Sequence, residues 1–297
     1  MRTATLLRIA AALPLAAGLY FAAPSADAAS GRITVKVGDQ IRSAFVTERY
    51  RTKRKLRPTI IVLGDAARAS TASRRGLRFQ NFLQRGGVLV YAQGAGGKWN
   101  IGADGAAKAE LAYLRSLIAQ LRRNSLADPR RIHLVGVGSG GIVALQAACS
   151  EAGLFAGVTA ALASLPNGQP ATCKTARPTN VMLIAGDADK RLPFGGGQAD
   201  LNSFKGSVAS VEETVQAFAG GAACSGKLAR IDLPDRDRSD ASRVVVERQT
   251  GCKARVQLVR IQGGGHFLPG QTFARPAVRG QNRDVTTTGL ITSFFRV

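Results

Sequence analysis

Three kinds of side chain, spread from residue 139 to residue 266 of the sequence, could together perform nucleophilic catalysis. Ser139 is followed along the chain by Asp187 and Asp189, and later by His266. A serine hydroxyl attacks a carbonyl carbon when a histidine removes its proton and a carboxylate orients that histidine. The order of these residues therefore suggests an acyl-transfer site, provided that the fold brings them together.

Ser139 lies in a run of small residues, Gly136 to Gly141, between a strand-like segment and an Ala-rich helical segment, Ile142–Cys149. A nucleophile elbow needs small neighbours, because the chain turns sharply and holds the serine at the start of a helix. Backbone amides at that position can stabilise an oxyanion. The alternative interpretation is a Gly-rich packing turn without chemistry.

The acid and base candidates also follow strand-like segments. Asp187 and Asp189 come after the apolar run Val181–Gly186, where a triad acid would stand, although an ordinary solvated turn would look similar. His266 follows three glycines in a loop after a strand, as a general base would. The only other histidine, His133, lies inside a predicted strand, so we interpret it as structural. Serine, acid and histidine in this order are typical of α/β-hydrolases.

The elements that must position these side chains alternate between strand-like and helix-like patterns. Apolar runs predict buried strands, and apolar residues at helical spacing predict amphipathic helices. An early alternating segment, turned by Gly38 and Asp39, predicts an antiparallel hairpin. We therefore expect a mostly parallel central sheet with helices on both faces. The predicted strands are 32–37, 41–46, 59–63, 88–91, 131–137, 157–163, 181–186, 244–248 and 255–261, and the helices 74–85, 110–122, 142–149, 210–219 and 284–295.

The N-terminus has the pattern of an export signal. Arg2 and Arg8 precede an apolar run, Ile9 to Ala23, and Ala26-Asp27-Ala28 resembles a cleavage site. We expect residues 1–28 to be removed and residues 29–297 to form one domain, secreted to an extracellular or periplasmic location. An uncleaved membrane anchor is the alternative. After signal cleavage we expect no membrane span.

Four cysteines remain, namely Cys149, Cys173, Cys224 and Cys252. An even number in an exported chain predicts two disulfides, and the spacing leaves all three pairings open. Because there is no Cys-x-x-Cys pair, the cysteines do not indicate a metal site.

The formal net charge of +22 is strongly basic. It favours contact with an anionic surface or polymer. The densest basic run, residues 49–57, is typical of a solvated loop. No nucleic-acid-binding module and no nucleotide or flavin fingerprint is present, so we expect neither a nucleic-acid partner nor a cofactor.

Several motifs resemble one esterase family, the polyhydroxybutyrate depolymerases and feruloyl esterases, and together they cover nearly all of the mature chain. Beside the elbow and the Gly-rich segment before His266, the similar segments are Asp128–Ile132, Leu154–Ala156, Ala185–Asp189, Leu192–Gly196, Pro269-Gly270, Lys98–Asn100, Ala223-Cys224 and Gly251-Cys252.

The resemblance implies an α/β-hydrolase fold that hydrolyses a polyester or a cell-wall ester. It implies Asp189, rather than Asp187, as the acid and His266 as the base. It also implies the disulfides Cys149–Cys173 and Cys224–Cys252. With Ser139 as nucleophile, the amides of Gly140 and of Gly64 or its neighbour would be oxyanion donors.

The chain departs from the family at three positions. The family elbow reads Gly-x-Ser-x-Gly-Gly, and its alignment places Gly138 at the nucleophile, with Ser139 one residue late. The family's His-Gly after the early buried strand is here Leu63-Gly64-Asp65, and its Trp after the catalytic histidine is Leu268. Asp65 would bring a negative charge towards a developing anion.

Two functional hypotheses follow from these departures. In the first, the turn shifts by one residue and Ser139 serves as the nucleophile of a secreted carboxylic ester hydrolase. In the second, the fold persists without esterase activity, and the protein binds a polymer or glycan. The residue types alone do not choose between them, because a shift of one residue rotates the hydroxyl and triads tolerate only small misplacements.

Overall fold

The computed structural model describes residues 29–49, 56–65, 77, 79–102, 107–173, 175, 177–271 and 278–297. The expected signal peptide, residues 1–28, lies outside the described residues, as do residues 50–55 of the basic run and most of residues 66–78.

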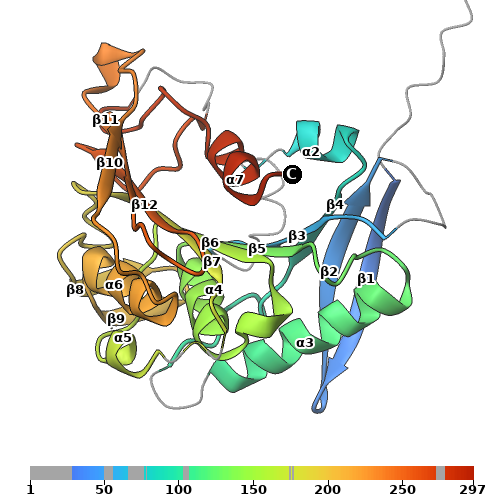
Figure 1. Ribbon diagram of the computed structural model, residues 1–297. Coiled ribbons are helices and arrows are strands. Elements are labelled where there is room, and N and C mark those ends of the chain that lie inside the picture. Colours follow the sequence, from blue (N-terminus) through green and yellow to red (C-terminus); the bar gives the residue numbers. More distant parts are fainter. Residues whose placement is uncertain are drawn as a thin grey trace, which may run out of the picture.

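A ten-stranded sheet with the order β1-β2-β4-β3-β5-β6-β7-β12-β11-β10 crosses the molecule (Figure 1). Its six central strands, from β4 to β12 in this order, are all parallel, and both edges are antiparallel. The strands are β1 Ala29–Val37, β2 Gln40–Glu48, β3 Thr59–Leu63, β4 Val88–Ala92, β5 Ile132–Val137, β6 Gly157–Ala161, β7 Asn180–Gly186, β10 Ala229–Asp232, β11 Arg243–Arg248 and β12 Val256–Gln262.

The central strands form because their residues are apolar on both faces, as a parallel sheet between two helical layers requires. Every residue of β3, β4, β5 and β6 is buried. The predicted N-terminal hairpin is present as β1 and β2, which pair antiparallel around Gly38 and Asp39. The predicted mostly parallel sheet with an antiparallel hairpin at its edge is therefore confirmed.

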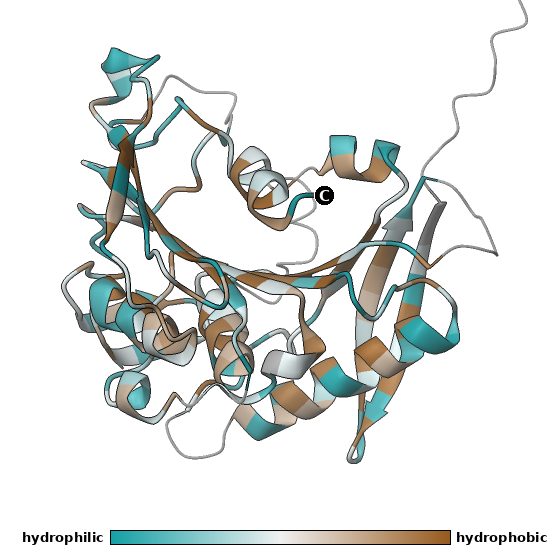
Figure 2. Ribbon diagram, viewed as in Figure 1, coloured by the Kyte–Doolittle hydropathy of each residue, from teal (hydrophilic) through white to brown (hydrophobic). Residues whose placement is uncertain are grey.

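Helices cover both faces of the sheet. One face carries α3, α4 and α6, and the other carries α2 and α7 (Figure 1). Two separate clusters of buried apolar side chains lie on these two faces. Apolar residues concentrate in the sheet and on the sides of the helices that meet it (Figure 2). The helices are α2 Gln80–Gln84, α3 Ala107–Arg123, α4 Ser139–Ser150, α5 Gln169–Thr172, α6 Val211–Gly221 and α7 Thr287–Phe295, with 3-10 turns at Ala152–Leu154 and Arg238–Asp240.

Local chemistry explains where two of these helices begin. Ser210 caps α6 by accepting a hydrogen bond from the amide of Glu213, whose carboxylate accepts one from the amide of Ser210. This capping box satisfies two amides that have no partner inside the helix. Helix α7 begins at Thr287, three residues after the predicted start, because the Thr286 hydroxyl caps it by accepting from the Gly289 amide.

A two-stranded hairpin, β8 Gly197–Leu201 and β9 Phe204–Val208, forms a second sheet that the sequence patterns did not predict. Two disulfides join Cys149 to Cys173 and Cys224 to Cys252, which is the pairing that the family resemblance implied. Among the described residues, none of the helices combines the length and the apolar character needed to cross a membrane.

Candidate active site

Asp189 and His266 meet at the carboxyl end of the sheet, in the loops that follow β7 and β12. Oδ2 of Asp189 lies 2.7 Å from Nδ1 of His266. The other carboxylate oxygen, Oδ1, accepts hydrogen bonds from the amides of Arg191 at 2.8 Å and Leu192 at 3.0 Å. Only 1% of the Asp189 side chain is exposed, against 14% for His266. A buried carboxylate with two backbone donors orients the imidazole, so that Nε2 is the nitrogen that can exchange a proton with a substrate.

Asp187, the other acid candidate, has a different role. Its Oδ2 accepts a hydrogen bond from Nε of Arg260 at 3.0 Å, and its Oδ1 accepts from the amide of Gly263 at 2.7 Å. Asp187 therefore ties the end of β7 to the start of the loop that carries His266. The structure brings Asp189, and not Asp187, into contact with the imidazole.

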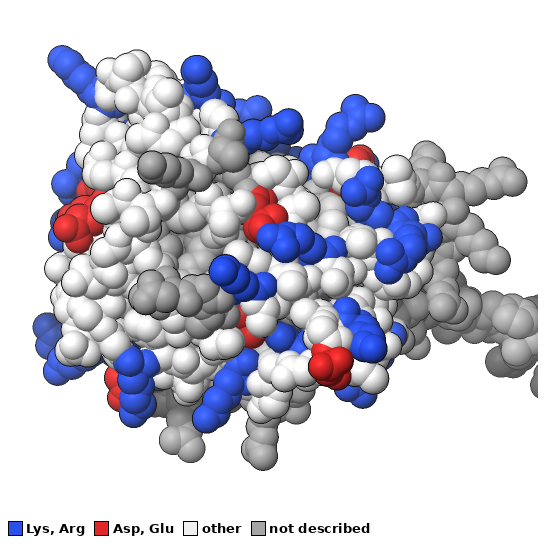
Figure 3. Space-filling model, turned by 90° about the horizontal axis from the view of Figure 1, so that it is seen from below, with Lys and Arg blue, Asp and Glu red and all other residues white. Residues whose placement is uncertain are grey.

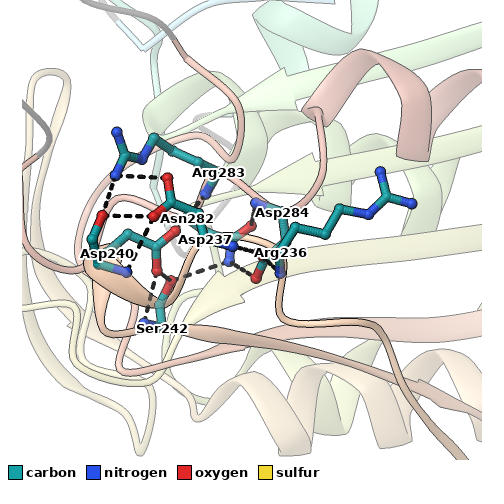
Figure 4. Close-up of polar contacts among 8 residues, drawn as sticks. Arg236, Asp237, Asp240, Ser242, Asn282, Arg283 and Asp284 are labelled. Atoms are coloured by element: carbon teal, nitrogen blue, oxygen red, sulfur yellow. Dashed lines mark hydrogen bonds and ion pairs between the residues drawn. The ribbon is translucent and has the colours of Figure 1, made fainter.

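Figure 4 shows a polar network whose central side chains, Asp240, Ser242, Asn282 and Asp284, are buried. The side chain of Asp240 accepts hydrogen bonds from Ser242 and from the amide of Arg283, and the side chain of Asn282 donates to Ser242 and Asp284. The carboxylate of Asp284 in turn accepts from the amides of Arg236 and Asp237. These contacts join the segment before β11 to the segment before α7.

Backbone hydrogen bonds connect this network directly to the loop that carries His266. The Gly280 amide donates to the carbonyl of Asp240, and the Gly265 amide donates to the carbonyl of Gly280, both at 2.9 Å. The amide of Gly270 donates to the carbonyl of Asn282 at 2.8 Å. The residues on either side of His266 are thus fixed by a buried scaffold, and this preorganises the imidazole.

The elbow between β5 and α4 has the backbone of a nucleophile turn, but glycine occupies its tip. Gly138 has φ 53° and ψ −123°, a strained conformation that L side chains rarely adopt. Gly140 packs so closely on the end of β3 that a Cβ there would lie 2.4 Å from the carbonyl oxygen of Leu63. The strained residue is therefore the one that the family alignment places at the nucleophile, and here it has no side chain.

Ser139 lies one residue further along, fully buried in the first turn of α4. Its hydroxyl donates to Oδ1 of Asp65 at 2.9 Å and accepts from the amide of Ser203 at 2.9 Å. Among the described residues, no hydrogen bond joins Ser139 to His266. The structure therefore brings together two of the three predicted catalytic residues and directs the hydroxyl of the third towards Asp65.

The two glycines expected to provide oxyanion donors lie side by side. A Cβ on Gly140 would be 2.6 Å from the carbonyl oxygen of Gly64, and that oxygen accepts a 2.5 Å hydrogen bond from Nε1 of Trp99. Trp99 is 3% exposed, so it fixes the Gly64 peptide from within the core. The amide that directly follows Gly138 is that of Ser139, and it donates to Oδ1 of Asp65 at 2.8 Å.

His133, interpreted as structural from the sequence, is buried on β5. Its ring stacks on that of Phe295 in α7, with the ring centroids 4.2 Å apart. Burial, followed by the positive charges of Arg255 and Arg131, lowers the pKa of His133 from 6.5 to about 4. It is therefore neutral at pH 7 and serves as packing between β5 and α7.

The face on the α3 and α4 side of the sheet is rich in Lys and Arg side chains, with few Asp or Glu among them (Figure 3). The side chains of Arg115, in the middle of α3, and of Arg131, just before β5, are exposed by 55% and 50%. The basic character of the chain is thus displayed on the surface. Among the described residues, no group of three His, Cys, Asp or Glu side chains is placed to hold a metal ion.

Sequence reasoning missed the hairpin β8–β9, whose tip reaches the elbow. The Asn202 side chain donates to Oδ2 of Asp65, and the Ser203 amide contacts the Ser139 hydroxyl. A signal was present, because Asn202 and Ser203 form a two-residue turn between two short segments of strand length. The Gly-rich and charged composition of these segments hid it.

No family model matches the sequence. The chain is 30% identical over 227 residues to a protein described as "Putative esterase NocK" from Nocardia uniformis subsp. tsuyamanensis. The match covers 70% of this chain and 65% of that protein, which is slightly less than two thirds of its length.

Solved structures with a similar fold include an acetyl xylan esterase from Aspergillus awamori, with a TM-score of 0.58, 11% identity, and 90% of this chain and 99% of that chain covered. A thermostable esterase has a TM-score of 0.51 and 13% identity, and the match covers 80% of this chain and 55% of that chain. A prolyl endopeptidase has a TM-score of 0.50 and 13% identity, and the match covers 81% of this chain and 35% of that chain. At these identities the similarity shows the fold alone, and the chain has the α/β-hydrolase fold.

Proposed function

We propose that this α/β-hydrolase-fold protein hydrolyses carboxylic esters, with His266 as general base and Asp189 as the group that orients it. The observation that carries the proposal is the Asp189–His266 contact of 2.7 Å, with the carboxylate buried and anchored by two amides. A buried, anchored carboxylate aimed at a partly exposed imidazole is the arrangement that general-base catalysis needs. The resemblance of the sequence to esterases also supports it.

The geometry favours water over Ser139 as the attacking group. The Ser139 hydroxyl is fully buried and bonded to Asp65 and the Ser203 amide, and Gly138 offers no side chain. In the proposed reaction, Nε2 of His266 takes a proton from water as the water oxygen bonds to the ester carbonyl carbon. The tetrahedral intermediate then expels the alcohol oxygen, which receives the proton back from the imidazolium, and an acid and an alcohol result.

A serine acyl-enzyme mechanism is the alternative route to the same products. It requires the Ser139 hydroxyl to leave Asp65 and turn towards His266. Because Ser139 begins α4, that change would need the first turn of the helix to move. The described contacts support the water route.

For the substrate we propose an ester of a polyester or of the plant cell wall, taken up outside the cytoplasm. The family motifs support this class of substrate, and the N-terminal signal pattern and two disulfides support export to an extracellular or periplasmic location. The basic face on the α3 and α4 side would favour substrates or surfaces that carry negative charge.

A second candidate function, the binding of a polymer or glycan without hydrolysis, is favoured by one observation. The amide of Ser139, which would stabilise the oxyanion of an ester transition state, donates instead to the Asp65 carboxylate. A site occupied in this way would not stabilise the transition state of ester hydrolysis.

The test is hydrolysis of p-nitrophenyl acetate by the purified mature protein, compared with Ser139→Ala and His266→Gln. We expect His266→Gln to lose about 10²–10⁴-fold in kcat/KM, and Ser139→Ala to retain hydrolysis above the background rate without a burst of p-nitrophenol. If Ser139→Ala is as inactive as His266→Gln, the serine is the nucleophile. If all three proteins remain at the background rate, the result contradicts ester hydrolysis and supports the binding of a polymer or glycan.

A further inference from the structure

The carboxylate of Asp65 lies at the centre of the elbow, where donors from two separate elements converge on it. Its Oδ1 accepts from the amide of Ser139 at 2.8 Å and from the Ser139 hydroxyl at 2.9 Å. Its Oδ2 accepts from the side-chain amide of Asn202, at the tip of the β8–β9 hairpin. Two of the donors belong to the first residue of the twelve-residue helix α4, whose N-terminus favours a negative charge.

The same carboxylate fills the space that a side chain on residue 138 would need. A Cβ built on Gly138 would lie 2.4 Å from Oδ1 of Asp65 and 2.5 Å from its Cγ. No real Cβ approaches another atom so closely, so a side chain at position 138 and this placement of Asp65 exclude each other. The observed position of the Asp65 carboxylate therefore depends on there being a glycine at position 138.

This placement has a consequence for ester hydrolysis. The negative oxygen that develops on an ester carbonyl is stabilised by donors already in place around it. Here the elbow amide, the Ser139 hydroxyl and the Asn202 side chain are such donors, and a permanent carboxylate occupies them. A second negative oxygen does not fit among donors that Asp65 already saturates.

We propose that Asp65 is a built-in occupant of the oxyanion site, held there by Asn202, and that it withdraws before an ester can react. The proposal rests on the proposed hydrolase function and deepens it. Once vacated, the site presents the Ser139 amide, the Ser139 hydroxyl and the Asn202 side chain to a carboxylate or to the tetrahedral oxyanion of an ester.

The hairpin that holds Asp65 is built in a way that permits this withdrawal. Strands β8 and β9 form their own two-stranded sheet, so the tip can shift without breaking a hydrogen bond of the ten-stranded sheet. Asn202 is exposed to solvent, and Asp65 is only partly buried.

The experiment compares Asp65→Ala and Asn202→Ala with wild type, using Asp200→Asn as the matched control. Asp200 is an exposed carboxylate on the same hairpin whose side chain pairs with Lys205. Two readouts are used, namely the binding of acetate, followed by the shift of the melting temperature, and the kcat for p-nitrophenyl acetate. Acetate binding needs no catalysis, so it tests the site even where no ester is hydrolysed.

We expect acetate to stabilise Asp65→Ala saturably and to leave wild type and Asp200→Asn unchanged. We expect kcat to rise by about 10- to 100-fold in Asp65→Ala, in line with the value of oxyanion donors, and to rise by less in Asn202→Ala, which loosens the occupant but also removes one donor. The Asn202→Ala variant keeps the test open if Asp65→Ala fails to fold.

Two results would overturn the proposal. One is acetate acting equally on wild type and Asp65→Ala, or on neither of them. The other is a kcat in both site variants no higher than that of Asp200→Asn while wild-type hydrolysis still depends on His266. The second result would leave the hydrolase function standing without the occupant. Acetate binding to Asp65→Ala with no hydrolysis by any variant would support the site and contradict the hydrolase.

Discussion

Two aspartates in this protein each lie just after a buried parallel strand, and their carboxylates contact very different partners. Asp65 follows the buried strand β3, Asp189 follows the buried strand β7, and each accepts hydrogen bonds from backbone amides. The second oxygen of Asp189 meets an imidazole, whereas Asp65 meets the helix terminus where a substrate anion would lie. The Asp189–His266 pair therefore has the arrangement that the proposed general base needs, whereas the carboxylate of Asp65 occupies the donors of the elbow.

The largest effect expected from this comparison concerns the two neighbouring carboxylates after β7. Asp189→Asn should lower kcat/KM by about 10²–10⁴-fold, because the amide no longer orients and stabilises the imidazolium of His266. Asp187→Asn, which changes the same chemical group two residues away, should affect stability more than rate. The measurement is steady-state ester hydrolysis beside urea unfolding, and equal losses of rate in the two variants would assign no special role to Asp189.

The next effect concerns the disulfide on the histidine side. Cys224–Cys252 closes a loop just before β12, which leads to His266, and it spans 28 residues. Replacing both cysteines with serine should lower the free energy of unfolding by about 2–5 kcal/mol. Urea unfolding measures this loss. Labelling of thiols at both positions in the unreduced wild-type protein would show that the bond does not form.

A low pH should lower the stability of the fold through His133, which lies on β5, the strand that leads to Gly138. Since its pKa is lowered to about 4 in the fold and is 6.5 in the unfolded chain, the unfolded state binds more protons between these values. The contribution of His133 to the free energy of unfolding is then fully present above pH 6.5, and it falls by on the order of 3 kcal/mol as the pH drops to 4. Urea unfolding between pH 7.5 and 4 should show a smaller loss in His133→Leu, and an unchanged pH dependence in that variant would rule out His133 as the cause.

The smallest expected effect is an increase in the rate of ester hydrolysis, and it tests whether a side chain at position 138 and the Asp65 carboxylate exclude each other. Gly138→Ser alone should be destabilised without gaining activity, because its Cβ meets the Asp65 carboxylate. Together with Asp65→Ala, the new serine should raise the rate about tenfold over Asp65→Ala and produce a burst of p-nitrophenol. Gly138→Ala in the same background, with the same backbone strain and no hydroxyl, is the control. A burst in that control would show that the new hydroxyl is not the nucleophile.

Much of the fold was predictable because each pattern reports a local physical requirement. The short, β-branched apolar run Thr59–Leu63 predicts a strand buried on both faces, and the spacing of apolar residues in 110–122 defines one face of α3. The hairpin β8–β9 was not predicted, because its Gly-rich and charged residues carry little apolar alternation. Its position depends on contacts with distant segments, including Leu165 and Asn167.

For the site, the sequence alone determined the candidates: a glycine where a nucleophile is expected, an aspartate after β3, and an acid and a histidine in the right order. Only the tertiary structure decided how they relate. It paired His266 with Asp189 and directed Ser139 towards Asp65, from 74 residues earlier in the chain. The physical reason is that residue types set which hydrogen bonds are possible, whereas the sheet order, with β3 beside β5 and β7 beside β12, sets which groups come close enough to form them.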